Sequence, residues 1–137
     1  MEETTLLRLE NVDICREENV ILHNASFVLK NGEFVYVIGK VGSGKSSLLK
    51  SLYCEIPIMN GDAFLMEYNL CKIKRKEIPY LRRKLGIVFQ DFQLLTDRSV
   101  IKNLEFVLKA TGWKSKDLIA ERIESVLLQV GMQNKGY

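Results

Sequence analysis

The feature that most constrains this chain is the segment "YVIGKVGSGKSSLLKSL", residues 36–52. The run that leads into it, "EFVYVIG", is almost continuously apolar, as in a strand that is buried on both faces of a parallel sheet. After the glycines, Leu48, Leu49 and Leu52 have helical spacing, and Pro57 ends the helical region. The order of strand, glycine-rich turn and helix predicts a unit of a layered α/β fold.

The glycines in this turn have a spacing that suits phosphate binding. The pattern G-x-x-x-x-G-K-[ST] runs from Gly39 to Ser46. Glycines let backbone N–H groups approach phosphate oxygens, and the N-terminus of the next helix adds its positive dipole end. Lys45 is expected to reach the β- and γ-phosphates as a catalytic residue, and the Ser46 hydroxyl to bind Mg²⁺. The candidate nucleotide-binding residues are Gly39, Lys40, Val41, Gly42, Ser43, Gly44, Lys45, Ser46 and Ser47.

The rest of the chain shows further strand and helix patterns. "LLRLENVDI" and "VILHNASFVL" predict an antiparallel pair, followed by a turn at Gly32. "GDAFLMEYNL" predicts another strand, "KEIPYLRRKL" a short helix, and "GIVFQ" a second buried strand. "SVIKNLEFVLKATG" and "SKDLIAERIESVLLQVG" predict two amphipathic helices, each opened by Ser and closed by Gly. The last helix is expected to present one apolar face made of Ile119, Ile123, Val126 and Val130.

A glutamine follows the second predicted buried strand and narrows the candidate reactions. Gln90 is the last residue of "GIVFQ". If both buried strands are parallel, Gln90 lies at the same sheet edge as the glycine loop, where α/β sheets bind ligands. Its amide oxygen is a candidate catalytic group that binds Mg²⁺ or orients water. The alternative is a loop glutamine in solvent.

Composition and charge narrow the class of protein. An apolar content of 47% and a charged content of 27% are typical of a globular domain. The net charge of +3 is too small to indicate nucleic acid as a partner, and we interpret the basic run 72–84 as a solvated helix face rather than a nucleic-acid or lipid patch. Three scattered cysteines and an N-terminus unlike a signal peptide indicate a cytoplasmic location.

"GKVGSGKSSLLK", followed by "RRKLGIVFQDFQLLTDRSVIKNL", resembles the nucleotide-binding subunits of ABC transporters. The resemblance extends from about Leu7 to Gly131 and points to their cell-division branch, the FtsE type, with lipoprotein-export and macrolide-export ATPases as near relatives. It implies an α/β P-loop NTPase fold, a RecA-like core with an antiparallel β subdomain. Residues 1–90 would form the nucleotide-binding core, which carries the phosphate loop and the strand before Gln90. Residues 91–137 would begin the helical subdomain.

The same resemblance implies an ATP-binding subunit that couples Mg²⁺-dependent ATP hydrolysis to a membrane complex. Residues 39–47 would bind ATP, and Gln90 would bind Mg²⁺ and face the membrane subunit. The family implies a cytoplasmic ATPase at the inner face of the cell membrane, which pairs as a homodimer around two ATP molecules. Its partner would be an integral membrane subunit, an FtsX-like permease in cell division.

The sequence departs from the family pattern in two ways. Cys15 stands where the family has an aromatic residue that stacks on adenine, so we expect weaker stacking. The family's signature segment, second acidic strand and switch histidine lie downstream of the part that resembles residues 115–131, and the single histidine, His23, precedes the loop. We therefore expect an incomplete fold. A truncated, non-catalytic nucleotide-binding fragment is the alternative function; a small P-loop kinase is less favoured, because no acceptor-binding lid is evident.

Overall fold

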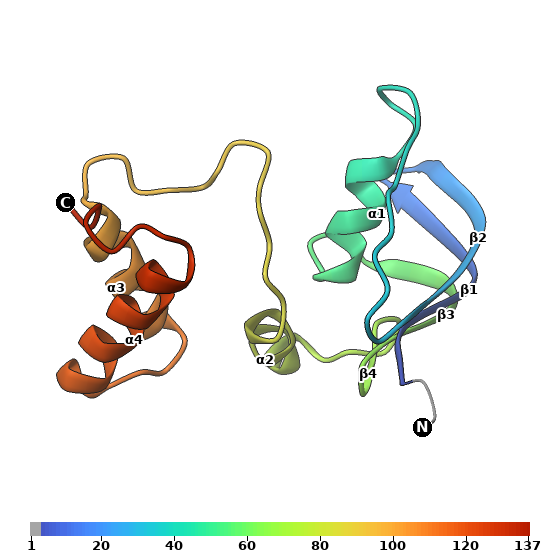
Figure 1. Cartoon of the computed structure of the whole chain (residues 1–137). Coiled ribbons are helices and arrows are strands. Elements are labelled where there is room, and N and C mark those ends of the chain that lie inside the picture. The colour runs from blue at the N-terminus through green and yellow to red at the C-terminus, as the bar shows by residue number, and fades with distance from the viewer. Residues whose placement is uncertain (1–3) are drawn as a thin grey trace. The chain divides into compact units, whose positions relative to one another are not determined.

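The computed structural model describes residues 4–137, which divide into two units. The first unit ends at Gly86, and the second comprises Ile87–Tyr137 (Figure 1). The segment 87–90, which the sequence assigns to the first domain, therefore belongs to the second unit. Among the described residues, no helix combines the length and the apolar character needed to cross a membrane.

The first unit is built on a four-stranded antiparallel sheet. Its strands are β1 (Thr5–Arg16), β2 (Asn19–Lys30), β3 (Ile58–Leu65) and β4 (Tyr68–Asn69), in the order β2-β1-β3-β4. The predicted pairing of the first two strands is confirmed, with Thr5 opposite Lys30 and Arg16 opposite Asn19. Three short helical segments complete the unit: α1 (Lys45–Leu52), the 3-10 helix η1 (Arg75–Glu77) and α2 (Ile78–Arg83).

A bulge in β1 lets one strand bury apolar residues at irregular spacing. Leu7 and Leu9 are buried, and so are Val12 and Ile14, so that the alternation shifts by one position between the two pairs. Asn11 has a φ of 51°, and the pairing of β1 with β2 shifts register between Leu9 and Val12. The extra residue restores the inward orientation of the second pair, as β-bulges do.

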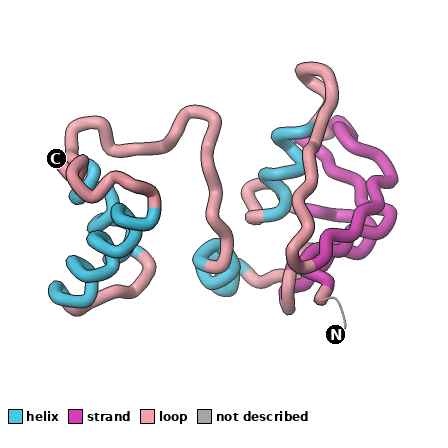
Figure 2. Tube along the Cα trace, in the orientation of Figure 1, coloured by secondary structure: helices cyan, strands magenta, loops and turns pink. Residues whose placement is uncertain are grey.

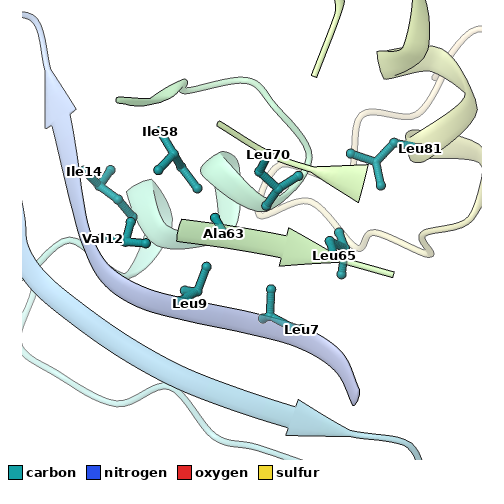
Figure 3. Close-up of a cluster of buried hydrophobic side chains, with 9 residues drawn as sticks. All are labelled: Leu7, Leu9, Val12, Ile14, Ile58, Ala63, Leu65, Leu70 and Leu81. Carbon is teal, nitrogen blue, oxygen red and sulfur yellow. The ribbon is translucent and has the colours of Figure 1, made fainter. Parts of the chain in front are cut away.

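The core of the first unit lies between the sheet and its helices. β1 and β3 supply most of the buried side chains, and α1 packs against them through Leu48 and Leu52. Leu81 of α2 is fully buried in the same cluster. Figure 3 shows this cluster, which comprises Leu7, Leu9, Val12, Ile14, Ile58, Ala63, Leu65, Leu70 and Leu81.

The second unit is a pair of helices with a core of its own. α3 (Val100–Ala110) and α4 (Lys116–Gln129) begin after Ser99 and Ser115, whose hydroxyls accept backbone N–H groups of the first turn as predicted. Three residues of α4 at i, i+4 spacing, Ile119, Ile123 and Leu127, pack against Val100, Leu104 and Leu108 of α3. The predicted face was wrong at its end, because α4 stops at Gln129 and Val130 is exposed.

The two predicted buried strands are absent from residues 4–137. Residues 33–40 and 85–89 are extended but lie outside the sheet, and Figure 2 shows them as loop. Phe34, Ile38 and Val88 are 80%, 89% and 91% exposed. An apolar run becomes a strand only where a neighbouring backbone pairs with it, and no described segment does so here. The expectation of buried parallel strands was therefore wrong for this structure.

The two cores predict that the units unfold in separate transitions. Trp113, the single tryptophan, lies in the second unit, so its fluorescence reports on the helix pair, while circular dichroism reports on the sheet as well. We expect the two signals to give different midpoints in urea, because probes coincide only when unfolding is all-or-none. One shared, sharp transition for both probes would contradict this prediction.

Candidate phosphate-binding site

The glycine loop is an exposed connection between the sheet and α1. All residues from Asn31 to Ser43 are exposed, and α1 begins at Lys45, directly after Gly44. The helix itself is fixed to the first unit, because Ser47 and Ser51 are buried on the face that Leu48 and Leu52 turn to the core. The loop is therefore open to solvent while the helix that follows it is anchored.

Gly44 is the point where the loop touches the sheet. Its φ of 99° is unfavourable for any residue with a Cβ. A Cβ added there would also lie 2.8 Å from Ile21 Cγ2 and 3.0 Å from Leu22 Cγ, both in β2. Only glycine allows this approach without a shift of the Ile21 or Leu22 side chain. The start of α1 is thus seated on residues 21–22 of the strand.

No side chain among the described residues caps the N-terminus of α1, since the position before Lys45 is a glycine. Across the loop, a Cβ on Gly39 would lie 2.6 Å from Ser43 Oγ, so the turn closes tightly around a glycine backbone. A narrow turn of glycines in front of an uncapped helix end has the features of an anion-binding backbone site, and it fits a phosphate group.

Lys45 supplies a positive charge inside this loop. Its Nζ donates hydrogen bonds to the carbonyl oxygens of Gly39 and Lys40, the latter at 3.1 Å. The amide N–H of Ser43 also donates to the Lys40 carbonyl, at 3.1 Å. The ammonium group therefore lies on the loop's own backbone, and its charge complements a phosphate bound there.

Asp13 links three strands of the first unit, and sequence reasoning missed it. Its Oδ1 accepts the backbone N–H of Asn24 at 2.8 Å and lies 2.9 Å from His23 Nδ1; its Oδ2 accepts Asn60 Nδ2 at 3.4 Å. The hydrogen bond from Asn24 and those from Asn60 and His23 hold the pKa of this carboxyl below its usual value, against the opposing effect of desolvation. An acidic residue between buried Val12 and Ile14 was the available signal.

The structure places the sequence-predicted site residues in two groups. Residues 39–47 lie together in the first unit, as the loop and the first turn of α1. Gln90 is an exposed turn residue of the second unit, and its role beside the phosphate loop stays a prediction. Cys15 is half-buried in β1, opposite Val20 of β2. The contacts of Ile21 and Leu22 with Gly44 carried no sequence signal, since they join residues far apart in the chain.

The model of the ABC transporter family matches residues 22–136, which include the whole glycine loop. The chain belongs to the ABC transporter family. The match begins within β2 and also covers α3 and α4, so it includes parts of both units but not β1. The resemblance inferred from the glycine loop and the segment around Gln90 is thereby confirmed.

Curated relatives of this ABC transporter family chain include proteins with two different roles in their names. The cell division ATP-binding protein FtsE of Bacillus subtilis (strain 168) is 40% identical over 83% of this chain and 50% of its own length. FtsE of Streptococcus pneumoniae serotype 2 is 39% identical over 83% and 49%. The methionine import ATP-binding protein MetN of Helicobacter pylori (strain ATCC 700392 / 26695) is 33% identical over 95% and 40%. The chain therefore spans about half the length of these relatives, or less.

Solved structures share the fold of this ABC family member. The cbiO1 protein of Clostridium perfringens, part of the ABC transporter complex cbiONQ, superposes with a TM-score of 0.84 over 97% of this chain and 53% of its own, at 25% identity. The ATP-binding cassette MJ0796, a dimer in a post-hydrolysis state bound to ADP and phosphate, gives a TM-score of 0.75 over 88% and 55%, at 29% identity. The chain therefore has the P-loop NTPase fold of ABC ATPase subunits.

The close approach at Gly44 predicts a large effect of a single methyl group. Gly44→Ala is expected to destabilise the sheet by about 1–3 kcal/mol more than Gly42→Ala, because overpacking adds to the backbone strain. Gly42 is the matched control: its φ is 84°, but an added Cβ would meet nothing within 4 Å. Urea unfolding followed by circular dichroism measures the free energy of unfolding of both variants. Equal losses of stability would show that the close contact with Ile21 and Leu22 does not add to the cost of Gly44→Ala.

Proposed function

We propose that this chain provides the ATP-binding part of an ABC-type ATPase of the FtsE kind. The observation that carries the proposal is the exposed glycine loop in front of the uncapped N-terminus of α1, with the Lys45 ammonium group on the loop backbone. Such a loop suits the terminal phosphates of a nucleotide. The identity of 39–40% to FtsE proteins over 83% of the chain supports the FtsE assignment. MetN relatives leave methionine import as the competing biological role.

The loop residues would divide the work of binding Mg²⁺–ATP. The backbone N–H groups of residues 39–47 would contact the phosphates, and Lys45 would exchange its bonds to loop carbonyls for the β- and γ-phosphates. The Ser46 hydroxyl, which is exposed in the first turn of α1, would be a Mg²⁺ ligand together with Gln90. Bound Mg²⁺ would neutralise charge on the phosphates during transfer to water.

The partners of the complete ATPase follow from the relatives. We propose a homodimer, which the dimeric state of MJ0796 supports, and an integral membrane subunit, which the cbiONQ complex of cbiO1 supports. For an FtsE-type protein that subunit would be an FtsX-like permease, and the ATPase would lie at the inner face of the cell membrane. ATP binding and hydrolysis would then drive a change in the permease.

Nucleotide binding without turnover is the second candidate function for these 137 residues. The exposed segment 33–38 favours it, because this run leads directly into the phosphate loop and no described strand holds it in place. Catalysis needs charged and polar groups fixed to fractions of an ångström, whereas phosphate can bind to a loop that adjusts to it. Phosphate release from the isolated chain at the level of a blank would support this function.

Removal of the Lys45 charge is the first test of the proposal. Lys45→Ala is expected to weaken Mg²⁺–ATP binding by about 10- to 100-fold, because a hydrogen bond to a charged group contributes about 1.5–3 kcal/mol. Titration calorimetry on the 137-residue chain measures the affinity. Lys50→Ala, a substitution later in the same helix, is the control and should bind as the wild type does. Equal affinities for Lys45→Ala and wild type would refute the assignment of the loop.

A substitution of Gln90 should affect ATP hydrolysis more than ATP binding. In a chimera that joins this chain to the remaining length of the Bacillus subtilis relative, we expect Gln90→Ala to keep most ATP affinity and to slow hydrolysis by about 10-fold or more, as removal of a group that positions water or metal does. The control is the substitution Gln93→Ala. In the wild type, the side-chain amide of Gln93 donates to Asp91 at 2.8 Å. Unchanged hydrolysis would make Gln90 an ordinary loop residue.

A further inference from the structure

The charges of this chain are strongly divided along the sequence. Residues 72–84 contain seven of the 20 lysines and arginines and a single acidic residue, Glu77. This stretch, called here the basic segment, carries a charge of +6. The remaining residues contain 13 basic and 16 acidic side chains, which leaves them with a charge of −3. The small net charge of the whole chain therefore hides one concentrated positive region.

The basic segment keeps its cations in solvent while its apolar residue anchors it. Lys72, residues 74–76 and residues 82–84 are all exposed. Leu81, in the middle of α2, is fully buried in the core of the first unit. Two of the cations, Arg82 and Arg83, thus lie on a helix that is anchored to the core of the first unit.

Few cations of the basic segment form ion pairs within the first unit. Lys84 pairs with Glu67, and it is the only one of the seven for which the described residues supply an ion-pair partner. Arg82 donates from Nε to the carbonyl of Tyr53 at 2.9 Å. Glu77 accepts the backbone N–H of Lys74 at 3.2 Å, so its carboxylate caps the helical turn. Ion pairs therefore leave most of this charge unneutralised.

Helix stability does not explain the cations at the start of the segment. Arg82 and Arg83 lie in the last turn of α2, where positive side chains stabilise the carbonyl end of a helix. Arg75 and Lys76 instead lie in η1, whose three residues are too few for a sizeable helix dipole. These two cations have no compensating ion pair among the described residues. An anion bound from outside the chain would neutralise the charges of Arg75 and Lys76.

Two tyrosines accompany the cations. Tyr80 is 58% exposed, and the guanidinium of Arg83 lies 5.1 Å from its ring centre; the ammonium of Lys84 lies 5.4 Å from that of Tyr68. Both rings line a surface depression of about 430 Å³. Glu67, Glu77 and Lys72 line it too, so its lining is not basic, and the contacts of an anion fall on the exposed cations around it. Amphipathic rings beside exposed cations suit a membrane–water interface.

We propose that the basic segment binds the headgroups of anionic phospholipids at a membrane surface. Clustered lysines and arginines are attracted to such a surface, and each contributes about a factor of five to the partition coefficient. A DNA duplex is less suited, because the exposed ring of Tyr80 beside these cations matches a membrane–water interface, which a duplex does not offer. The solvated helix face inferred from the sequence is thus assigned a partner. The proposal requires neither nucleotide nor permease, so it stands or falls apart from the ATPase assignment.

Flotation with vesicles tests the proposal on the full 137-residue chain. Vesicles of equal parts phosphatidylcholine and phosphatidylglycerol should carry the chain upward at low salt, and phosphatidylcholine vesicles should not. The triple variant Lys74→Gln, Arg75→Gln and Lys76→Gln should lower the partition coefficient by about 100-fold, since three cations are lost. Physiological salt should weaken the binding of the wild type, because it screens charges beyond about 8 Å. Aggregates sediment in this assay and are not counted as bound.

A second triple variant with the same change in charge is the control. Lys109→Gln, Lys114→Gln and Lys116→Gln alters exposed lysines of the second unit and should float with anionic vesicles as the wild type does. An equal loss in this variant would show that only net charge matters and would overturn the proposal. So would equal flotation with phosphatidylcholine alone, which would assign binding to the exposed apolar segment 33–38. Binding to a DNA duplex without flotation would assign the basic segment to nucleic acid instead. Matching circular dichroism spectra for both variants exclude misfolding as the cause.

Discussion

The close approach of Gly44 to Ile21 and Leu22 is the constraint on which the candidate site depends. It places the residue that precedes α1 directly against β2, and a Cβ at this position would clash with the side chains of Ile21 and Leu22. From this point Leu48 and Leu52 run into the core, so the helix axis is fixed at both ends. The phosphate loop then needs no contact of its own with the core. The loop can remain exposed to solvent because α1, which follows it, is anchored to the core.

The same arrangement explains why the loop is exposed on its other side. Residues 33–38 lead into it as an extended, apolar run, yet the sheet of the first unit closes without them, in the order β2-β1-β3-β4. Residues 85–89, which span the boundary between the two units, are likewise an extended run outside the sheet. Both runs are rich in apolar residues, and neither is part of the sheet. The segments that precede the glycine loop and Gln90 are thus not held by strand pairing.

Local sequence signals predicted most of the structure, and the failures have a common physical cause. Serine caps, the pairing of β1 with β2 across a short turn and the spacing of Leu48 and Leu52 follow from neighbouring residues, and the structure confirms them. The strands predicted at "EFVYVIG" and "GIVFQ" depend on a partner backbone, which no local pattern reveals. The role of Asp13 likewise depends on Asn24 and Asn60, in two other strands. The glycine loop could be predicted because its pattern lies in consecutive residues, whereas Gln90 lies far from the loop in the sequence and its role stays a prediction.

The direct measurement of phosphate binding is the amide spectrum of the ¹⁵N-labelled chain during titration with Mg²⁺–ATP. If the backbone of the loop binds phosphate, the largest shifts fall on the amides from Gly42 to Ser47, with smaller ones at Ile21 and Leu22, which support Gly44. The basic segment 72–84 is the strongest competing attractor of anions in the chain. Shifts confined to residues 72–84, with the loop amides unmoved at saturation, would contradict the assignment of the glycine loop as the nucleotide site.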